Sequence, residues 1–240
     1  MDLTAETKRL DDIATDSVYA VGANRAMIEY CFCILQRLFP RPRHVLEMGP
    51  AEGVMTERLR KISDHLSVVE GSPAFCDDIE KRFPEVRTHC ALFETFDTND
   101  RFDLIVLGHV LEHVEDPVAV LRRSAGWLAP GGSIFSAVPN ARSLHRQAAV
   151  IMGLLECEDQ LNDMDRHHGH RRVMNPESFR ACFRQAGLRI NTFGGYWLKP
   201  VSSGQIEQTW TSGMLDAFMQ LGERYPDIAG EMYVVAGAST

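Results

Sequence analysis

Between residues 44 and 139 the chain alternates short apolar runs with segments of helical spacing, and this rhythm limits the possible folds most. The runs are HVLEMG (44–49), LSVVEG (66–71), VRTHCAL (86–92), FDLIVLG (102–108) and SIFSAVP (133–139). Residues 53–62, 73–83 and 117–128 lie between them and have the apolar period of helices. Most of the runs are apolar on both faces. This pattern predicts a parallel sheet covered by helices, an α/β doubly wound fold.

The flanking segments extend this pattern at both ends. Residues 22–38 have helical spacing, which the prolines of residues 40–42 end. Residues 175–187 predict a helix with Asn175 as its cap, Pro176 at its first position and Gly187 at its end. Two more strands are expected at residues 188–198 and 230–238, with a helix between them. Residues 141–174 read as helix, polar loop and basic cluster, an insertion above the sheet.

Composition excludes several kinds of protein. The net charge of −8 argues against broad nucleic-acid binding, which needs a basic surface. No apolar run reaches the roughly 18 residues of a membrane span, and the charged first residues lack the apolar core of a signal peptide. The six cysteines are scattered without metal-ligand spacing. We therefore predict a cytoplasmic protein with reduced thiols that binds neither nucleic acid nor membrane.

The first two strands end in residues suited to a nucleoside ligand. Ligands of open α/β sheets bind beyond the carboxyl ends of the strands. The first strand ends in Glu47, Gly49 and Gly53, spaced Glu-x-Gly-x-x-x-Gly, and the second ends in Glu70. Glycines let the backbone approach a ligand, and a carboxylate at the second strand's end can accept both ribose hydroxyls. Alone, each could be a turn glycine or a solvated carboxylate, but their order on successive strands favours a nucleoside.

The stretch HVLEH matches the His-x-x-Glu-His pattern of one class of zinc peptidases, with His109, Glu112 and His113 as its members. Those enzymes carry the pattern within a helix. Here Asp116 and Pro117 predict that the helix begins only at Pro117, which leaves the motif in a turn after a strand. We therefore expect no metal, and we expect Glu112 and His113 to brace the loop by hydrogen bonds.

Four stretches, VLEMGPAEG, VVEG, the run from FDLIVLGHVLEHVEDP to SAVPN, and GEMYVVAG, resemble class I S-adenosylmethionine-dependent methyltransferases, in particular a small-molecule, ubiquinone-pathway-like subgroup. The resemblance covers residues 40–140 well and 175–236 more loosely. It implies a Rossmann-like, seven-stranded sheet with an antiparallel last strand. Residues 1–240 would then form one domain, with a helical N-terminal lid (1–40), a cofactor-binding half (41–140), a substrate-cap insertion (141–174) and the rest of the sheet (175–240).

The same resemblance implies how S-adenosylmethionine binds. Its methionine end would lie on Glu47, Gly49 and Gly53, and its ribose on Glu70. The remaining cofactor residues would be Leu92 and Phe93 beside the adenine, and Gly108 and His109 beneath the methionine portion. Pro50 stands where many relatives have cysteine or glycine. Some ubiquinone-pathway relatives look able to hold magnesium with Glu-x-x-Glu-His, but His109 in the first position is a weaker ligand for a hard ion.

The acceptor side is expected around the insertion. Asn140, His145 and Arg146 follow the fifth strand, so they should point toward the transferred methyl. The loop at residues 165–172 adds Asp165, His167, His168, His170, Arg171 and Arg172, although a solvated basic loop would read the same. A resemblance to small bacterial methyltransferases with PNxxSLHR, GHRR and GxxLKP implies that the acceptor pocket is lined by His145, Arg146, His170, Arg171 and Lys199.

These residues suggest the chemistry. His145 and His170 would take a proton from the acceptor, while the arginines favour an anionic or heavily hydroxylated group. Tyr19, Tyr196 and Trp197 would either supply apolar walls or belong to the core. The expected reaction is methyl transfer to oxygen or nitrogen of a small polar metabolite, such as a sugar, an amino acid derivative or a natural-product intermediate.

Other classes of protein remain as alternatives. A nicotinamide-dependent oxidoreductase would need a Gly-x-Gly-x-x-Gly loop, which is missing. A nucleic-acid methyltransferase would carry Asn-Pro-Pro-aromatic or Asp-Pro-Pro-aromatic after the fourth strand, also missing. A non-enzymatic cofactor-binding or partner module and a metal-dependent hydrolase using His109, Glu112 and His113 stay open. The N-terminal helices could also pack against a second subunit, as in a homodimer.

Overall fold

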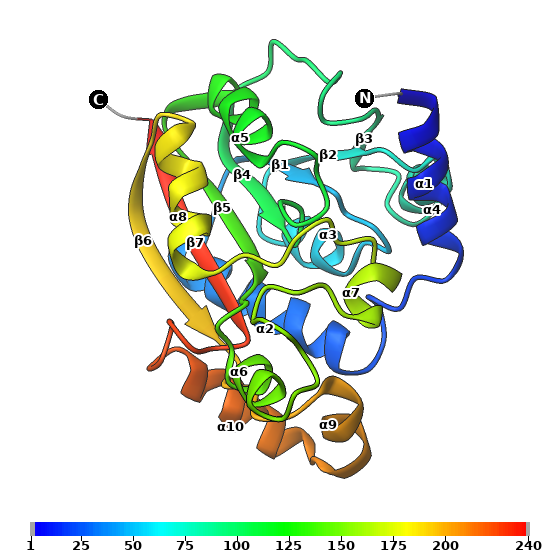
Figure 1. Ribbon diagram of the computed structural model, residues 1–240. Coiled ribbons are helices and arrows are strands. Elements are labelled where there is room, and N and C mark those ends of the chain that lie inside the picture. The colour runs from blue at the N-terminus through cyan, green and yellow to red at the C-terminus, as the bar shows by residue number, and fades with distance from the viewer. Residues whose placement is uncertain (1–2, 239–240) are drawn as a thin grey trace.

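A computed structural model describes residues 3–238, and its centre is one seven-stranded sheet of order β3-β2-β1-β4-β5-β7-β6 (Figure 1). All neighbouring strands are parallel except β7, which is antiparallel to both β5 and β6. The predicted sheet with its antiparallel last strand is therefore confirmed. The strands are β1 (His44–Met48), β2 (His65–Glu70), β3 (Arg87–Cys90), β4 (Phe102–Gly108), β5 (Leu128–Pro139), β6 (Leu188–Tyr196) and β7 (Glu231–Ala238).

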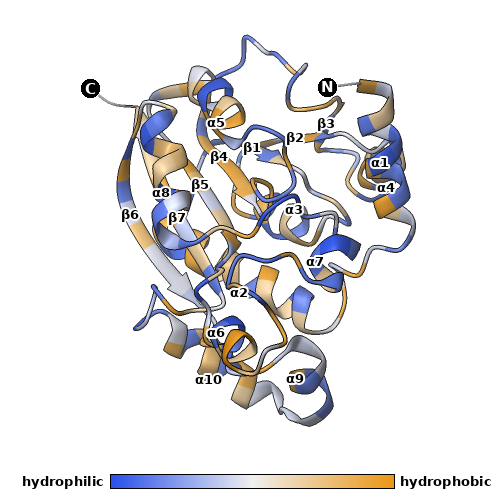
Figure 2. Cartoon of the chain, in the orientation of Figure 1, coloured by the Kyte–Doolittle hydropathy of each residue, from blue (hydrophilic) through white to orange (hydrophobic). Residues whose placement is uncertain are grey.

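Helices cover both faces of this sheet, which explains why its strands are apolar on both sides. Along β4, Leu104 and Val106 belong to one buried cluster, and Ile105 and Leu107 belong to another. The first cluster packs under α2 (Gly22–Leu38), α3 (Val54–Leu59), α4 (Pro73–Arg82) and α10 (Ser212–Gly222). The second packs under α5 (Pro117–Gly126) and α8 (Pro176–Gln185). Apolar residues gather along the inner strands in Figure 2.

Local sequence signals set several of these helix starts. Asp116 accepts hydrogen bonds from the backbone N–H groups of Val118 and Ala119, and Pro117 begins α5 as predicted. Asn175 caps α8 in a capping box, with Pro176 in its first turn. The segment between β6 and β7 holds two helices, α9 (Ser203–Thr209) and α10, where the sequence predicted one.

The first helix, α1 (Leu3–Thr15), lies beside α4 at one end of the sheet. Its Asp11 carboxylate accepts hydrogen bonds from the Ser72 hydroxyl (2.5 Å) and the Ala74 N–H (3.4 Å). The insertion contributes α6 (Leu144–Ile151) and α7 (Asp163–His167). Among residues 3–238, no helix combines the length and apolarity that crossing a membrane requires.

Candidate active site

The loop after β1 is shaped by its two glycines. Gly49 and Gly53 have φ values of +72° and +73°, a left-handed conformation that favours glycine. A Cβ added at Gly53 would also lie 2.6 Å from Cδ1 of Ile79. Gly53 therefore lets the loop pack against α4 before α3 begins. The loop leaves Gly49 facing the end of the sheet, where a Cβ would approach Val110 to 3.0 Å.

Two buried carboxylates mark the ends of β1 and β2. Glu47 is 3% exposed and accepts a hydrogen bond from the Thr56 hydroxyl at 2.6 Å. Burial, opposed by this hydrogen bond, raises the pKa of Glu47 to about 8. Glu70 accepts from the backbone N–H groups of Ser72 (2.9 Å) and Ala51 (3.3 Å), which aim its carboxylate across the glycine loop. Burial also raises the pKa of Glu70.

A pocket that is partly open to solvent lies over these strand ends. Its walls include all but one of the predicted cofactor residues, namely Glu47, Gly49, Glu70, Leu92, Phe93, Gly108 and His109. Gly53 is not in the wall, because it packs beneath the loop. Helices α1 and α2 close the pocket with Leu10, Ile13, Met27, Ile28 and Cys31, residues that sequence reasoning did not assign to the site.

At the β4 end of the pocket lies a hub of buried polar groups around His109. This residue has φ +59°, a strained conformation for a residue other than glycine. Its Nδ1 lies 3.4 Å from Glu112 and 3.8 Å from Glu231, and its Nε2 lies 3.2 Å from the Tyr196 hydroxyl. Burial lowers the pKa of His109, but the two carboxylates outweigh burial and raise it overall.

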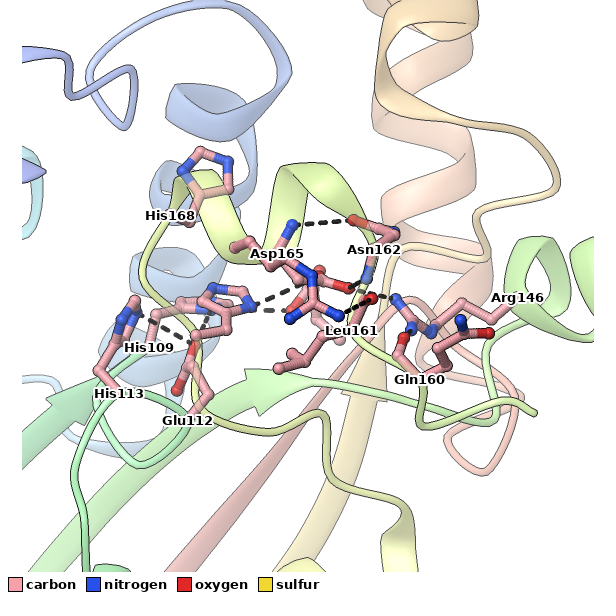
Figure 3. Close-up of polar contacts among 12 residues, drawn as sticks. His109, Glu112, His113, Arg146, Gln160, Leu161, Asn162, Asp165 and His168 are labelled. Atoms are coloured by element: carbon pink, nitrogen blue, oxygen red, sulfur yellow. Dashed lines mark hydrogen bonds and ion pairs between the residues drawn. The ribbon is translucent and has the colours of Figure 1, made fainter. Parts of the chain in front are cut away.

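The hub continues into the insertion (Figure 3). His113 lines the pocket, and its Nε2 lies 4.0 Å from Glu112 Oε1. A ring nitrogen of His170, a ring nitrogen of His113 and a carboxylate oxygen of Glu112 lie within 4.8 Å of one another. His170 Nδ1 is 3.4 Å from Asp165, whose carboxylate also pairs with Arg146 at 3.1 Å. The close trio is therefore Glu112, His113 and His170, and it does not include His109.

Three of the predicted acceptor-binding residues use their polar atoms within the protein. Asn140 donates to the carbonyls of Asp227 and Ala229. Arg146 donates to the carbonyls of Glu158 and Gln160 as well as to Asp165, and it is 4% exposed. Arg171 bonds Glu6 of α1 at 2.8 Å and the carbonyl of His113. These residues hold the insertion and α1 in place.

The remaining predicted residues divide between the pocket and its surroundings. Tyr19 lines the pocket, stacks on His168 at 5.0 Å between ring centroids and donates from its hydroxyl to the His168 carbonyl. Lys199 donates to Ser203 at 2.8 Å. His145 is largely buried, and burial lowers the pKa of its imidazole to about 3. His145, His170 and Lys199 lie outside the pocket wall.

Two buried acids of the hub were missed as site residues. Glu112 was expected to brace a loop or, in the hydrolase alternative, to act with His109 and His113, and Glu231 was not considered. Glu112 and Glu231 are 1% and 6% exposed. The one sequence signal for Glu231 is a carboxylate at the start of the apolar strand GEMYVVAG, because a charge in a central strand needs a reason.

The sheet order and the chemistry at its strand ends define the class of the protein, which is a class I S-adenosylmethionine-dependent methyltransferase. More narrowly, the chain belongs to the methyltransferase-domain family, whose model matches residues 23–192. Over 188 residues, 74% of each chain, it is 25% identical to a ubiquinone biosynthesis O-methyltransferase of Xanthomonas axonopodis pv. citri (strain 306).

Solved structures share the fold at low identity. The N-methyltransferase NodS of Bradyrhizobium japonicum WM9, in complex with S-adenosyl-L-homocysteine, aligns with a TM-score of 0.63 at 15% identity over 100% of both chains. The methyltransferase CcbJ of Streptomyces caelestis aligns with a TM-score of 0.64 at 14% identity, again over 100% of both chains.

Proposed function

We propose that this chain transfers the methyl group of S-adenosylmethionine to oxygen or nitrogen of a small polar metabolite. The observation that carries the proposal is the pocket itself. It joins the glycine loop and both strand-end carboxylates to a wall of aromatic and imidazole side chains. Because cofactor-side residues and imidazole side chains line the same pocket, it suits a cofactor and an acceptor side by side.

The cofactor end is assigned from the contacts around the loop. Glu70 is aimed by two backbone N–H groups, which suits a carboxylate that accepts the two ribose hydroxyls. Glu47 lies under the methionine end, where it can receive an ammonium group. Leu92 and Phe93 form the apolar wall for the adenine. Gly108 and His109 follow β4 and lie beneath the methionine portion.

The acceptor end is assigned to the imidazole wall. Methyl transfer needs donor and acceptor aligned in a site that excludes water, and a neutral hydroxyl or an ammonium must also lose a proton. His113 lines the pocket, and burial lowers its pKa to about 3, so its neutral imidazole can accept a hydrogen bond from the methyl acceptor. His170 and Glu112 stand behind it, and His145 lies farther out.

Helix α1 is proposed to act as the lid. Leu10 lies against Gly71 so closely that a Cβ there would approach Leu10 Cδ1 to 2.5 Å. Arg9 of α1 donates to the Gly169 carbonyl, and Glu6 pairs with Arg171. The lid thus spans from the cofactor end to the insertion, and a ligand beneath it is shielded from water.

Calorimetry with S-adenosyl-L-homocysteine tests the cofactor assignment. The wild type should bind it, and Glu70→Gln should weaken binding at least tenfold without lowering the melting temperature by more than a few degrees. Binding to the wild type together with transfer of a labelled methyl group to compounds in a metabolite extract would support an enzyme. Binding without any transfer would favour a cofactor-binding module, and no binding would reject the proposal.

A further inference from the structure

The cations expected to recognise an anionic acceptor are already occupied. Arg146 donates hydrogen bonds to Asp165 and to two carbonyls. Arg171 donates to Glu6 and to the His113 carbonyl. Arg9, the guanidinium in the pocket wall, pairs with Glu6 at 2.7 Å. Arg9 and Arg171 share the carboxylate of Glu6, and Arg146 pairs with the buried Asp165, so binding an anion with any of them would first break an ion pair that is already formed. The pocket is therefore poorly suited to a carboxylate or phosphate.

Carboxylates, in contrast, are left with free hydrogen-bonding capacity. Glu112 Oε1 has only His109 Nδ1, at 3.4 Å, within hydrogen-bonding range, and among residues 3–238 the Oε2 atoms of Glu112, Glu231 and Glu52 have no hydrogen-bond donor. Glu112 is 1% exposed, and its neighbours lower its pKa to about 2 despite burial, so it is a buried anion. A buried carboxylate without donors is costly, and a ligand that brings N–H or O–H groups removes that cost.

The spacing of the trio of Glu112, His113 and His170 fits an ammonium group. One nitrogen that donates three hydrogen bonds of about 2.9 Å at tetrahedral angles separates its acceptors by about 4.7 Å. A tetrahedral metal ion with ligands at about 2.1 Å would draw them to about 3.4 Å. The three atoms here lie within 4.8 Å of one another, a span that one ammonium nitrogen can bridge, and the 4.0 Å from Glu112 Oε1 to His113 Nε2 lies between the two values.

The other groups around the trio are compatible with a cation. Burial lowers the pKa of His113 to about 3 and that of His168 to about 4, so both imidazoles are neutral near pH 7. His170 Nδ1 faces the Asp165 carboxylate, and a proton held there leaves Nε2 as an acceptor. Tyr19 lies on the same pocket wall, with 6.5 Å between its ring centroid and that of His113.

We propose that the methyl acceptor is an amine, held through its protonated nitrogen by Glu112, His113 and His170. This inference rests on the proposed function. The ammonium first loses one proton to solvent, and the lone pair of the resulting amine then forms a bond to the methyl carbon. The carbon–sulfur bond breaks with its electrons on sulfur, which leaves S-adenosyl-L-homocysteine and a methylated ammonium.

Two matched triplets of probes test this. Phenethylamine, 2-phenylethanol and phenylacetate form one, and glucosamine, glucose and glucuronate the other. Binding is measured by calorimetry with protein saturated with S-adenosyl-L-homocysteine, and methyl transfer by mass spectrometry. In at least one triplet the amine should bind at least tenfold more tightly than the alcohol, and the carboxylate most weakly. Equal binding within both triplets, preference for the carboxylates, or no binding of any probe would overturn the proposal.

Substitutions in the trio test whether it is the site that binds the amine. Glu112→Gln and His170→Asn should each weaken amine binding about tenfold and leave alcohol binding and S-adenosyl-L-homocysteine binding unchanged. Glu115→Gln, the same change at an exposed position in the same loop, is the matched control and should alter nothing. Amine binding that survives both site variants would refute the assignment.

Elemental analysis separates an amine site from a metal site at the same trio. The purified wild type should carry no stoichiometric transition metal, and a chelator should not change amine binding. A bound metal that disappears in His170→Asn would show that the trio ligates an ion, and would overturn the amine proposal. If the wild type binds S-adenosyl-L-homocysteine but shows no preference for amines, the proposed function stands and only this inference fails.

Discussion

The unusual ionisation of Glu47 makes cofactor binding depend on pH. Burial raises the pKa of Glu47 from 4.5 to about 8, so in the free protein about nine in ten of these carboxyls are protonated at pH 7. An ammonium group of the ligand above Glu47 favours the ionised form. Binding should therefore release close to one proton below pH 8, and affinity should rise with pH up to the free-protein pKa and then level off.

The size of the effect follows from the same pKa. If only the ionised form binds, the dissociation constant for S-adenosyl-L-homocysteine falls about 25-fold between pH 6.5 and pH 8.5, or about 1.9 kcal/mol. Calorimetry at pH 6.5 in phosphate and in imidazole buffer counts the released proton from the difference in enthalpy.

Glu47→Gln is the control, because it keeps the shape and removes the titration. This variant should release no proton, and its affinity should be flat over the same pH range. A wild type that releases less than about 0.2 proton at pH 6.5, or a variant that releases as many as the wild type, would refute the reasoning about Glu47.

Three further outcomes are expected. Gly53→Ala should destabilise the protein by about 2–4 kcal/mol in urea unfolding, because Gly53 combines φ +73° with a 2.6 Å distance from an added Cβ to Ile79. Gly153→Ala is the control: Gly153 has the same φ but open space around it, so the change should cost only about 1 kcal/mol. Equal losses of stability in the two variants would contradict the packing argument. Residues 3–15 should exchange amide hydrogens more slowly when S-adenosyl-L-homocysteine is bound, and Leu10→Ala should weaken its binding; unchanged exchange would reject the lid. His170→Ala should lower methyl transfer to the best probe more than His145→Ala does, with S-adenosyl-L-homocysteine affinity kept in both, and the reverse order would return the leading role to His145.

Much of the fold is encoded locally in the sequence. Short runs that are apolar on both faces form the buried strands, because only a doubly covered sheet can hide both sides. Asp116 and Asn175 carry their capping role in the sequence itself, since a cap needs only the backbone three residues away. Gly49 and Gly53 likewise mark the loop that shapes the pocket, because few other residues adopt their backbone conformation.

The partners of charged side chains were decided only by the tertiary structure. Arg146 and Arg171 look like anion-binding residues in the sequence, but the fold brings Asp165 and Glu6 to them and leaves Oε2 of Glu112 without a donor. The physical reason is that hydrogen bonds and ion pairs depend on distances of a few ångströms between residues far apart in the chain. Backbone conformation can be predicted from residues adjacent in the sequence. The hydrogen-bonding groups at the acceptor end of the pocket are set only when α1, β4, β7 and the insertion come together in the fold.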